Sequence, residues 1–256
     1  MLSYEDVKNI GDFKKLEIKN AERDYLQEVV LFVLYDKIVN KELVFKGGTC
    51  LYKVYKLNRF SEDLDFTLNG KLDLEKLVTK LYYNLSSLGV NSRIKEIKKY
   101  KNEINIRLLL HGPLYKGRTE EECFIPINIS RRERVSLEPK YEMIISMYRD
   151  LSNFTVFIMD EKEILAEKIR AIYSRDVPRD VYDLWFLLIH RHVAINENFL
   201  NKKLKLIRIK FNFNEFMTKV ETKRKLWERD LKNLIMGQLP DFGAVKNDIS
   251  KAISKI

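Results

Sequence analysis

The chain of 256 residues is 45% hydrophobic and 33% charged, which is typical of a globular protein with one large domain or two modest ones. Its longest apolar run, Val29 to Tyr35, is too short to span a membrane, and MLSYEDVKNIGDFKK lacks the apolar stretch of a signal peptide, so we expect a cytoplasmic protein without a membrane partner. The net charge of +10, with 14 Lys and Arg against 7 Asp and Glu after residue 195, indicates a polyanionic partner.

The first part of the chain is expected to be mainly helical. Residues 1–20 show little periodicity and are predicted to form a short helix or arm. From Ala21, apolar residues at helical spacing predict a mostly buried helix that ends near Val39. The apolar run from Leu43 to Phe45 then predicts a core strand that lies beside this helix.

Two glycines follow this strand directly, in the sequence Lys46-Gly47-Gly48-Thr49. The apolar residues after them recur at helical spacing, so the glycines stand at the entrance of a helix. Backbone N–H groups are unpaired there, and glycine lets a ligand approach them closely. The segment therefore predicts either a phosphate site, to which Thr49 adds a hydroxyl, or a simple turn.

A pair of aspartates follows at strand spacing. The sequence from Asp63 to Leu68 alternates strictly, so Asp63, Asp65 and Thr67 share one face of a predicted strand. Two neighbouring carboxylates repel each other, and the usual relief is a bound cation. A hard ion such as Mg²⁺ prefers one or two carboxylates together with substrate phosphates. The pair predicts a metal site, and the alternative is a solvated strand face.

The middle of the chain is expected to complete a sheet. A helix over residues 74–89 is followed by a hairpin of two strands, 90–99 and 103–110, whose many lysines and arginines either protect a sheet edge or contact RNA. Further strands are predicted at Cys123–Ser130, Tyr141–Met147 and Phe154–Met159. Cys50 and Cys123 lack metal-ligand spacing and are expected to be buried.

The rest of the chain is expected to be helical. In residues 163–188, Lys168 and Arg175 lie at the edge of a buried helical arc and point inward, so each needs an anion, which is either a protein carboxylate or a triphosphate. Asp183 belongs to a buried helix, where a pair with Arg179 is the simple expectation and does not exclude a functional role. The last helix is predicted to begin near Val245. Lys223, Arg224 and Lys225 are expected on a basic surface that contacts RNA or is merely solvated.

Two segments resemble a known family. KGGTCLYKVY followed by RFSEDLDF resembles the abortive-infection AbiEii/AbiGii toxin nucleotidyltransferases, which include the MenT toxins. Residues 163–188 also resemble them, with an Ala-Glu-Lys helix followed by Arg-Asp-x-x-Asp. The resemblance covers roughly residues 40–190. It implies an α+β fold, with a polymerase-beta-like nucleotidyltransferase mixed sheet and flanking helices over residues 1–160 and a C-terminal helical bundle over 161–256.

The resemblance also implies roles for individual residues. The metal ligands would be Asp63 and Asp65. The catalytic residues would be Asp63, Asp65, Lys168 and Asp183. The nucleotide would be held by Lys46, Gly47, Gly48, Thr49, Arg59 and Ser61.

One position departs from the family pattern. Such enzymes usually take a third carboxylate from a later strand, and the matching position here is Asn128. Either Asp183 or another acid supplies the missing charge, or only one metal ion binds tightly.

The reaction that the resemblance implies is transfer of a nucleotide from an NTP, with Mg²⁺ or Mn²⁺, to the 3′ end of tRNA, by a toxin that a separate antitoxin protein opposes. The alternatives are nucleotide transfer onto a protein or small molecule, and a catalytically silent protein that binds nucleotides or RNA.

Overall fold

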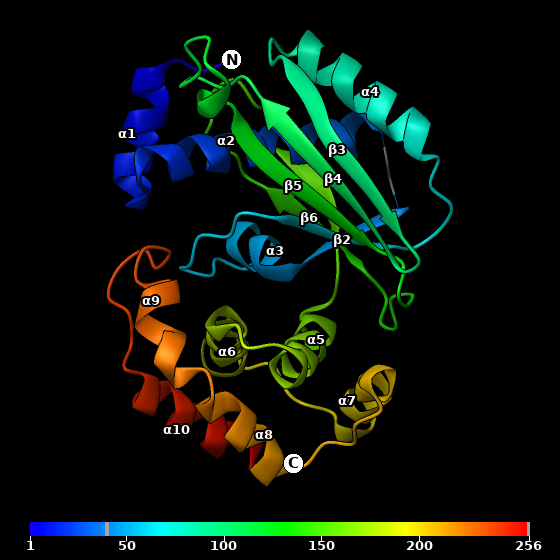
Figure 1. Cartoon of the computed structure of the whole chain (residues 1–256), viewed down its shortest axis with the longest axis vertical. Coiled ribbons are helices and arrows are strands. Elements are labelled where there is room, and N and C mark those ends of the chain that lie inside the picture. Colours follow the sequence, from blue (N-terminus) through cyan, green and yellow to red (C-terminus); the bar gives the residue numbers. More distant parts are fainter. Residues whose placement is uncertain (39–40, 255–256) are drawn as a thin grey trace. The chain divides into compact units, whose positions relative to one another are not determined.

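The computed structural model of the chain describes residues 1–38 and 41–254 (Figure 1). These residues form two compact units. The first, here called the sheet unit, comprises Met1–Lys56 and Phe60–Met159. The second, here called the helical unit, comprises Leu57–Arg59 and Asp160–Ile256. Three residues at the start of the RFSEDLDF region, two that precede it and Arg59 that begins it, thus belong with the second half of the chain.

The sheet unit is built on a mixed sheet of seven strands in the order β3-β4-β5-β2-β1-β7-β6. Strands β1 and β7 are parallel, as are β2 and β5, and the other neighbouring pairs are antiparallel. The predicted mixed sheet is therefore confirmed. The strands are β1 (Leu43–Lys46), β2 (Leu64–Leu68), β3 (Ser92–Tyr100), β4 (Glu103–Leu110), β5 (Cys123–Ser130), β6 (Lys140–Ile144) and β7 (Phe154–Ile158).

Burial alternates along the central strands as the sequence pattern predicted. In β5, Ile125, Ile127 and Ile129 are buried, whereas Phe124 and Asn128 on the other face are partly exposed. The predicted bounds of β5 are the observed ones, and the predicted basic hairpin is formed by β3 and β4, with β3 at one end of the sheet. Strand β6 ends at Ile144, three residues before the predicted end at Met147.

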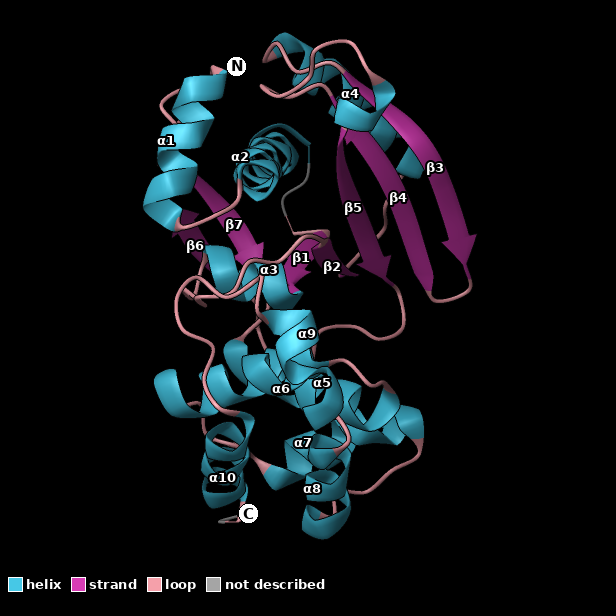
Figure 2. Ribbon diagram, turned by 60° about the vertical axis from the view of Figure 1, so that its left-hand side comes forward, coloured by secondary structure: helices cyan, strands magenta, loops and turns pink. Residues whose placement is uncertain are grey.

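Helices of the sheet unit lie against this sheet, with α4 beside β3 and α2 beside β5 (Figures 1 and 2). The N-terminal segment forms a helix, α1, because Ser3 and Asp6 make a reciprocal capping box at its start. Helix α2 begins three residues before Ala21 and continues into a π-helical segment, and its predicted end at Val39 lies outside the described residues. The elements are α1 (Tyr4–Lys14), α2 (Ile18–Phe32), η1 (Val33–Ile38), α3 (Gly47–Lys53), α4 (Leu74–Ser87) and the short η2 (Thr119–Glu121).

The second half of the chain is helical, as predicted. Its last helix begins at Phe242 rather than near Val245, because the Asp241 side chain caps the backbone N–H of Ala244. Both cysteines of the chain are buried, as expected. The elements are α5 (Glu161–Ser174), α6 (Pro178–Trp185), η3 (Phe186–His190), α7 (Glu197–Leu204), η4 (Lys205–Ile207), α8 (Phe213–Glu221), η5 (Arg224–Leu226), α9 (Trp227–Leu231) and α10 (Phe242–Ile253).

Of the helices in the described part of the chain, none is long and apolar enough to cross a membrane.

Candidate active site

Gly47 packs directly against the carboxylate of Asp65. Strand β1 ends at Lys46, which lies opposite Asp65 in β2, and the chain then turns into α3 with Gly47 at φ 73°. A Cβ atom at Gly47 would stand 2.5 Å from Oδ2 of Asp65. Both the left-handed backbone and the close approach therefore require glycine here. The absence of a side chain lets one carboxylate oxygen of the aspartate pack against the backbone at the start of α3.

A row of polar side chains crosses four strands at this level. Lys46, Asp65, Asn128 and Asn105 are successive register partners in β1, β2, β5 and β4, so their side chains share one face of the sheet. The Asn105 amide donates to Oδ1 of Asn128 over 2.8 Å, and the Asn128 amide donates to Oδ1 of Asp65 over 3.0 Å. Asn105 also donates to the Glu103 carboxylate over 2.6 Å. A hydrogen-bonded chain thus fixes the orientation of Asp65.

Asn128 occupies the predicted third-carboxylate position and acts as a donor. A carboxylate can only accept a hydrogen bond, so the group that faces Asp65 must be the amide nitrogen. This contact gives Asp65 a hydrogen-bond donor, whereas a carboxylate at position 128 would repel it. Sequence reasoning missed Asn105 and Glu103, although the polar residues at alternate positions of the apolar strand EINIRLLL are a signal for them.

The segment before β2 is held by side chains from two helices. The Gln27 amide of α2 donates to the backbone carbonyls of Ser61 and Glu62, each over 2.9 Å. Thr49 of α3 is fully buried, and its hydroxyl donates to the backbone carbonyl of Asp63. The residues predicted to hold a nucleotide, Thr49 and Ser61, therefore also position the backbone that carries Asp63.

Helix α3 is anchored at its other end by a buried ionic cluster. The ammonium of Lys53 pairs with Asp24 and, over 3.0 Å, with Glu28, both from α2. Lys14 and the Tyr148 hydroxyl are further partners of Asp24. Burial would raise the pKa of Asp24, but the positive charges of Lys53 and Lys14 outweigh it and hold this pKa far below its usual range.

The donor set beside Gly47 fits a hard divalent cation that shares its coordination with a substrate. Asp63 and Asp65 are partly exposed, and alternation along the strand directs both to one face. Within residues 1–38 and 41–254, no group of three or more His, Cys, Asp or Glu is arranged to hold a metal ion. Two carboxylates suffice for Mg²⁺ only when substrate phosphates and water supply the other ligands.

The remaining predicted residues form a second buried cluster, in the helical unit. Arg59 binds Asp183 through two bonds, Nε to Oδ1 over 2.9 Å and Nη2 to Oδ2 over 3.0 Å. Lys168 lies 2.6 Å from Oδ2 of Asp183 and 3.0 Å from Oδ1 of Asp180. Arg175 binds Asp180 through both Nε and Nη2. Three cations thus alternate with two aspartates, and Asp183 pairs with Arg59 and Lys168 in place of the predicted Arg179.

The charges in this cluster are stabilised in their ionised forms. Burial would raise the pKa of Asp180, but Lys168 and Arg175 outweigh it and lower this pKa to about 2. Burial would lower the pKa of Lys168, but Asp183 and Asp180 outweigh it and raise it. Protein carboxylates are therefore the partners of both predicted cations. Arg175 does not point inward as predicted, because 57% of its side chain is exposed.

The prediction that Lys223 belongs to a basic surface is wrong. Its side chain is buried, and its ammonium donates to the Ile172 carbonyl over 3.1 Å and pairs with Asp176 over 2.7 Å. Arg224 is exposed but pairs with Glu221, which also binds Lys246 over 2.8 Å. Most of the charge of the segment 223–225 is therefore used within the helical unit.

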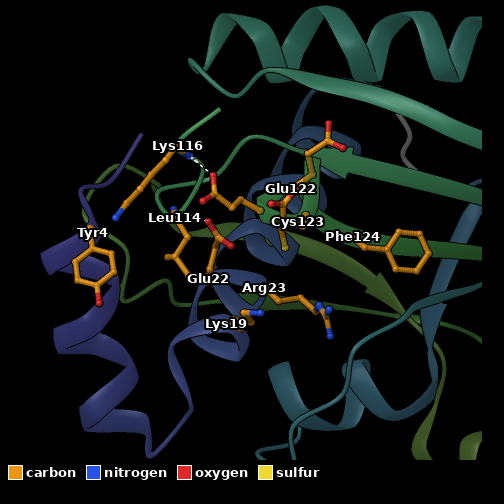
Figure 3. A pocket seen from close by; sticks show the side chains of 11 residues that line it. Tyr4, Lys19, Glu22, Arg23, Leu114, Lys116, Glu122, Cys123 and Phe124 are labelled. Carbon is orange, nitrogen blue, oxygen red and sulfur yellow. Dashed lines mark hydrogen bonds between the residues drawn. The ribbon is translucent and has the colours of Figure 1, made fainter. Parts of the chain in front are cut away.

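A separate pocket of about 450 Å³ lies in the sheet unit, between the start of α2 and the start of β5 (Figure 3). Its lining is rich in carboxylates, so it does not suit a triphosphate. One of these, Glu22, accepts a hydrogen bond from the backbone N–H of Leu114 over 2.7 Å. Its acidic residues are Glu22, Glu120, Glu121 and Glu122.

Comparisons with known proteins identify a family and similar folds. A family model described as "Nucleotidyl transferase AbiEii toxin, Type IV TA system" matches residues 29–249. The nucleotidyltransferase toxin MenT4 from Mycobacterium tuberculosis has a similar structure, with a TM-score of 0.68 and 18% identity over 99% of this chain and 89% of that chain. JHP933 from Helicobacter pylori gives a TM-score of 0.61 and 21% identity over 94% of this chain and 92% of that chain. A search of curated proteins found no match.

Replacing Gly47 by alanine should remove the metal site at little cost to the fold. Gly89 has nearly the same backbone, φ 75° against 73°, and has open space around it, so Gly89→Ala is a matched control. Both changes place alanine in the left-handed region, at a cost of about 1 to 2 kcal/mol. Only Gly47→Ala also displaces the Asp65 carboxylate, so it alone should lose Mg²⁺-dependent nucleotide binding in calorimetry. Equal nucleotide affinity in the two variants would contradict the site.

Lys168→Met should destabilise the protein more than Arg175→Met, because both remove a cation from Asp180 but only Lys168 is buried. Each aspartate keeps one cationic partner, so we expect a loss of about 1 to 3 kcal/mol, below the roughly 3 to 5 of a pair broken outright.

When the pH is lowered, Lys168→Met should also begin to lose stability at a higher pH than the wild type. The lowered pKa of Asp180 contributes stability that is present above its ordinary value of 3.8 and is lost as the pH falls toward about 2. Without Lys168 that pKa rises, so the acid transition should begin earlier. Denaturant unfolding between pH 2 and 7 measures both effects, and equal losses in the two variants would show that burial is irrelevant.

Proposed function

The chain belongs to the AbiEii nucleotidyltransferase toxin family, and we propose that it transfers a nucleoside monophosphate from an NTP to a hydroxyl at the 3′ end of tRNA, in the presence of Mg²⁺ or Mn²⁺. The observation that carries the proposal is the contact of Gly47 with Asp65, which brings the carboxylate of Asp65 directly against the start of α3. The fold of MenT4 supports the same reaction class.

In the proposed reaction, Asp63 and Asp65 would hold the cation. The ion would neutralise phosphate charge and make the acceptor hydroxyl more acidic. The hydroxyl oxygen forms a bond to the α-phosphorus, the bond to the bridging oxygen breaks, pyrophosphate leaves and the hydroxyl proton passes to solvent. Asn128 keeps Asp65 oriented through the hydrogen bond that its amide donates.

Gly47, Gly48 and Thr49 are proposed to hold the phosphates through their backbone N–H groups, with Lys46 as the adjacent cation. Helix α3 has only seven residues, so its dipole contributes little and the N–H groups themselves would bind the phosphates. Ser61 is proposed to contribute to nucleotide binding through the backbone segment that leads from it to Asp63.

Arg59, Lys168 and Asp183 keep a proposed role in nucleotide transfer that rests on the family resemblance. Arginine and lysine side chains are the usual groups that bind nucleotide phosphates, and both types lie around Asp183 in this cluster.

The physiological partners are proposed from the family. Its description names a toxin of a type IV toxin–antitoxin system, which implies an antitoxin protein as the antagonist. The basic net charge of +10 favours RNA over a neutral small molecule as the acceptor.

Asp63→Asn and Asp65→Asn should abolish transfer without loss of stability. Each change removes one of two repelling carboxylates and keeps the side-chain volume, so the thermal midpoint should hold or rise. The assay incubates each protein with labelled NTPs, Mg²⁺ and total tRNA, and in parallel with total protein. Labelled tRNA from the wild type alone supports the proposal. Labelled protein would redirect it to a different acceptor, and full activity in both variants would refute the metal site.

RNA binding should depend on salt through a cluster of exposed cations at the end of α7. Lys202, Lys205, Arg208 and Lys210 are exposed, and no described carboxylate pairs with them. Each phosphate contact releases counterions and contributes roughly 0.7 to 0.9 to the slope of log K against log salt. Lys205→Ala/Arg208→Ala should therefore flatten this slope by about 1.5.

The matched control is Arg224→Ala/Lys246→Ala, which removes the same formal charge from cations that are already paired with Glu221. Its slope should stay close to that of the wild type. Equal slopes in all three proteins, measured by fluorescence anisotropy with labelled tRNA, would show that the cluster at the end of α7 is merely solvated.

A further inference from the structure

Arg107 lies on the face of the sheet that carries the aspartate pair. It follows Asn105 by two residues in β4, so the two side chains point to the same side. Its register partner in β5 is Pro126. Strand β2 pairs with the other edge of β5, and because Leu64 of β2 lies opposite Ile127, Asp63 lies opposite Pro126. Arg107 and Asp63 are therefore separated by two strand spacings, about 10 Å, which a guanidinium and a bound substrate together can span.

The guanidinium of Arg107 is held over an aromatic ring. Its central carbon lies 5.9 Å from the centroid of Phe124, and both side chains are partly buried. In Figure 3 the Phe124 ring projects away from Cys123 and the side chains of α2, as expected for consecutive residues of a strand. The ring and the guanidinium thus form a step on rigid strands, here called the Arg107–Phe124 step.

This cation lacks an anionic partner in the part of the chain that the structure describes. No described carboxylate pairs with Arg107, and Glu96, its neighbour in β3, pairs instead with Lys98 over 3.2 Å. Other partly buried cations of the sheet unit, such as Lys53 and Arg23, have carboxylate partners. A guanidinium that is held by a ring and lacks a carboxylate is suited to bind an external anion.

The order of the strands distinguishes the two substrates of the proposed reaction. On one side of Asp65 lies β1, with Lys46 and Gly47, and on the other side lie β5 and β4, with Asn128 and Arg107. In an in-line displacement at phosphorus, the entering hydroxyl and the leaving pyrophosphate stand on opposite sides of the α-phosphorus. If the triphosphate lies on the β1 side, the acceptor therefore approaches over β5 and β4.

We propose that the Arg107–Phe124 step binds the unpaired acceptor end of an RNA, with Arg107 on a backbone phosphate and Phe124 stacked on a base. This inference rests on the proposed function and adds the acceptor subsite to it. Guanidinium groups bind phosphate oxygens in a fork, and aromatic rings stack on the splayed bases of single-stranded RNA. An RNA end that meets both contacts would place its terminal hydroxyl toward Asp63 and Asp65.

The test compares Arg107→Ala and Phe124→Leu with Lys99→Ala as the control. Lys99 is exposed on the same sheet but lies opposite Ile104, whose side chain belongs to the buried face, so this control removes one charge from the other side. We expect Arg107→Ala and Phe124→Leu each to raise the KM for acceptor RNA about tenfold and to leave the KM for NTP unchanged. Lys99→Ala should change neither. Arg107→Lys keeps the positive charge but loses the forked geometry of the guanidinium, so its KM for acceptor RNA should lie between those of the wild type and Arg107→Ala.

A second measurement makes the test independent of catalysis. Each substitution is combined with Asp65→Asn, and binding of a labelled single-stranded oligoribonucleotide is followed by anisotropy, with circular dichroism to check folding. Reduced oligonucleotide binding supports the step even if the wild type labels no RNA, in which case only the proposed function fails. Unchanged binding and KM for RNA, or an equal rise of both KM values, would overturn the inference. If Arg107→Ala is misfolded, the results for Phe124→Leu and Arg107→Lys decide whether the inference holds.

Discussion

The buried pairing of Lys53 with Asp24 and Glu28 is the constraint on which the sheet unit's candidate site depends. Lys53 is the last residue of α3, whose first residues are the glycines beside Asp65. Two charges taken out of water cost several kcal/mol each, and attraction offsets this only when the geometry is good and further hydrogen bonds are made. Here the Asp24 backbone carbonyl also accepts from Lys53, over 2.8 Å. A helix of seven residues that is fixed so firmly at its end can hold its glycines at a defined place.

The sequence predicted most of the sheet because the sheet has one buried and one polar face. Positions with partly exposed side chains recur at even spacings among the buried ones in β2, β4 and β5, and a slip of one residue would exchange the faces, so the pattern determines the strands and most of their inner residues. The pairing of Phe45 with Ile158 could not be predicted in this way. Contacts between strands so far apart in the sequence leave no trace in local periodicity.

The sequence was a poorer guide to charged residues, because periodicity shows which positions face inward but not which partners they meet there. Lys223 looked like part of a basic surface, yet Asp176 and the Ile172 carbonyl compensate its buried charge. Arg59 lies in the same motif as Asp63, but the chain segment Leu57–Arg59 packs in the helical unit, where Arg59 binds Asp183. A motif that is continuous in sequence thus supplies residues to two separately packed units.

The amide at position 128 changes the electrostatics of the site in a way that links its two proposed ligands. A third carboxylate beside Asp65 would bind a cation more tightly, but it would also repel Asp65 whenever the cation is absent. Asn128 instead donates to Asp65, so the polar row is satisfied without a metal ion. With only two carboxylates, the ion must take its other ligands from water and substrate phosphates. Metal and nucleotide then each raise the affinity of the site for the other, by the reciprocity that governs any two coupled ligands.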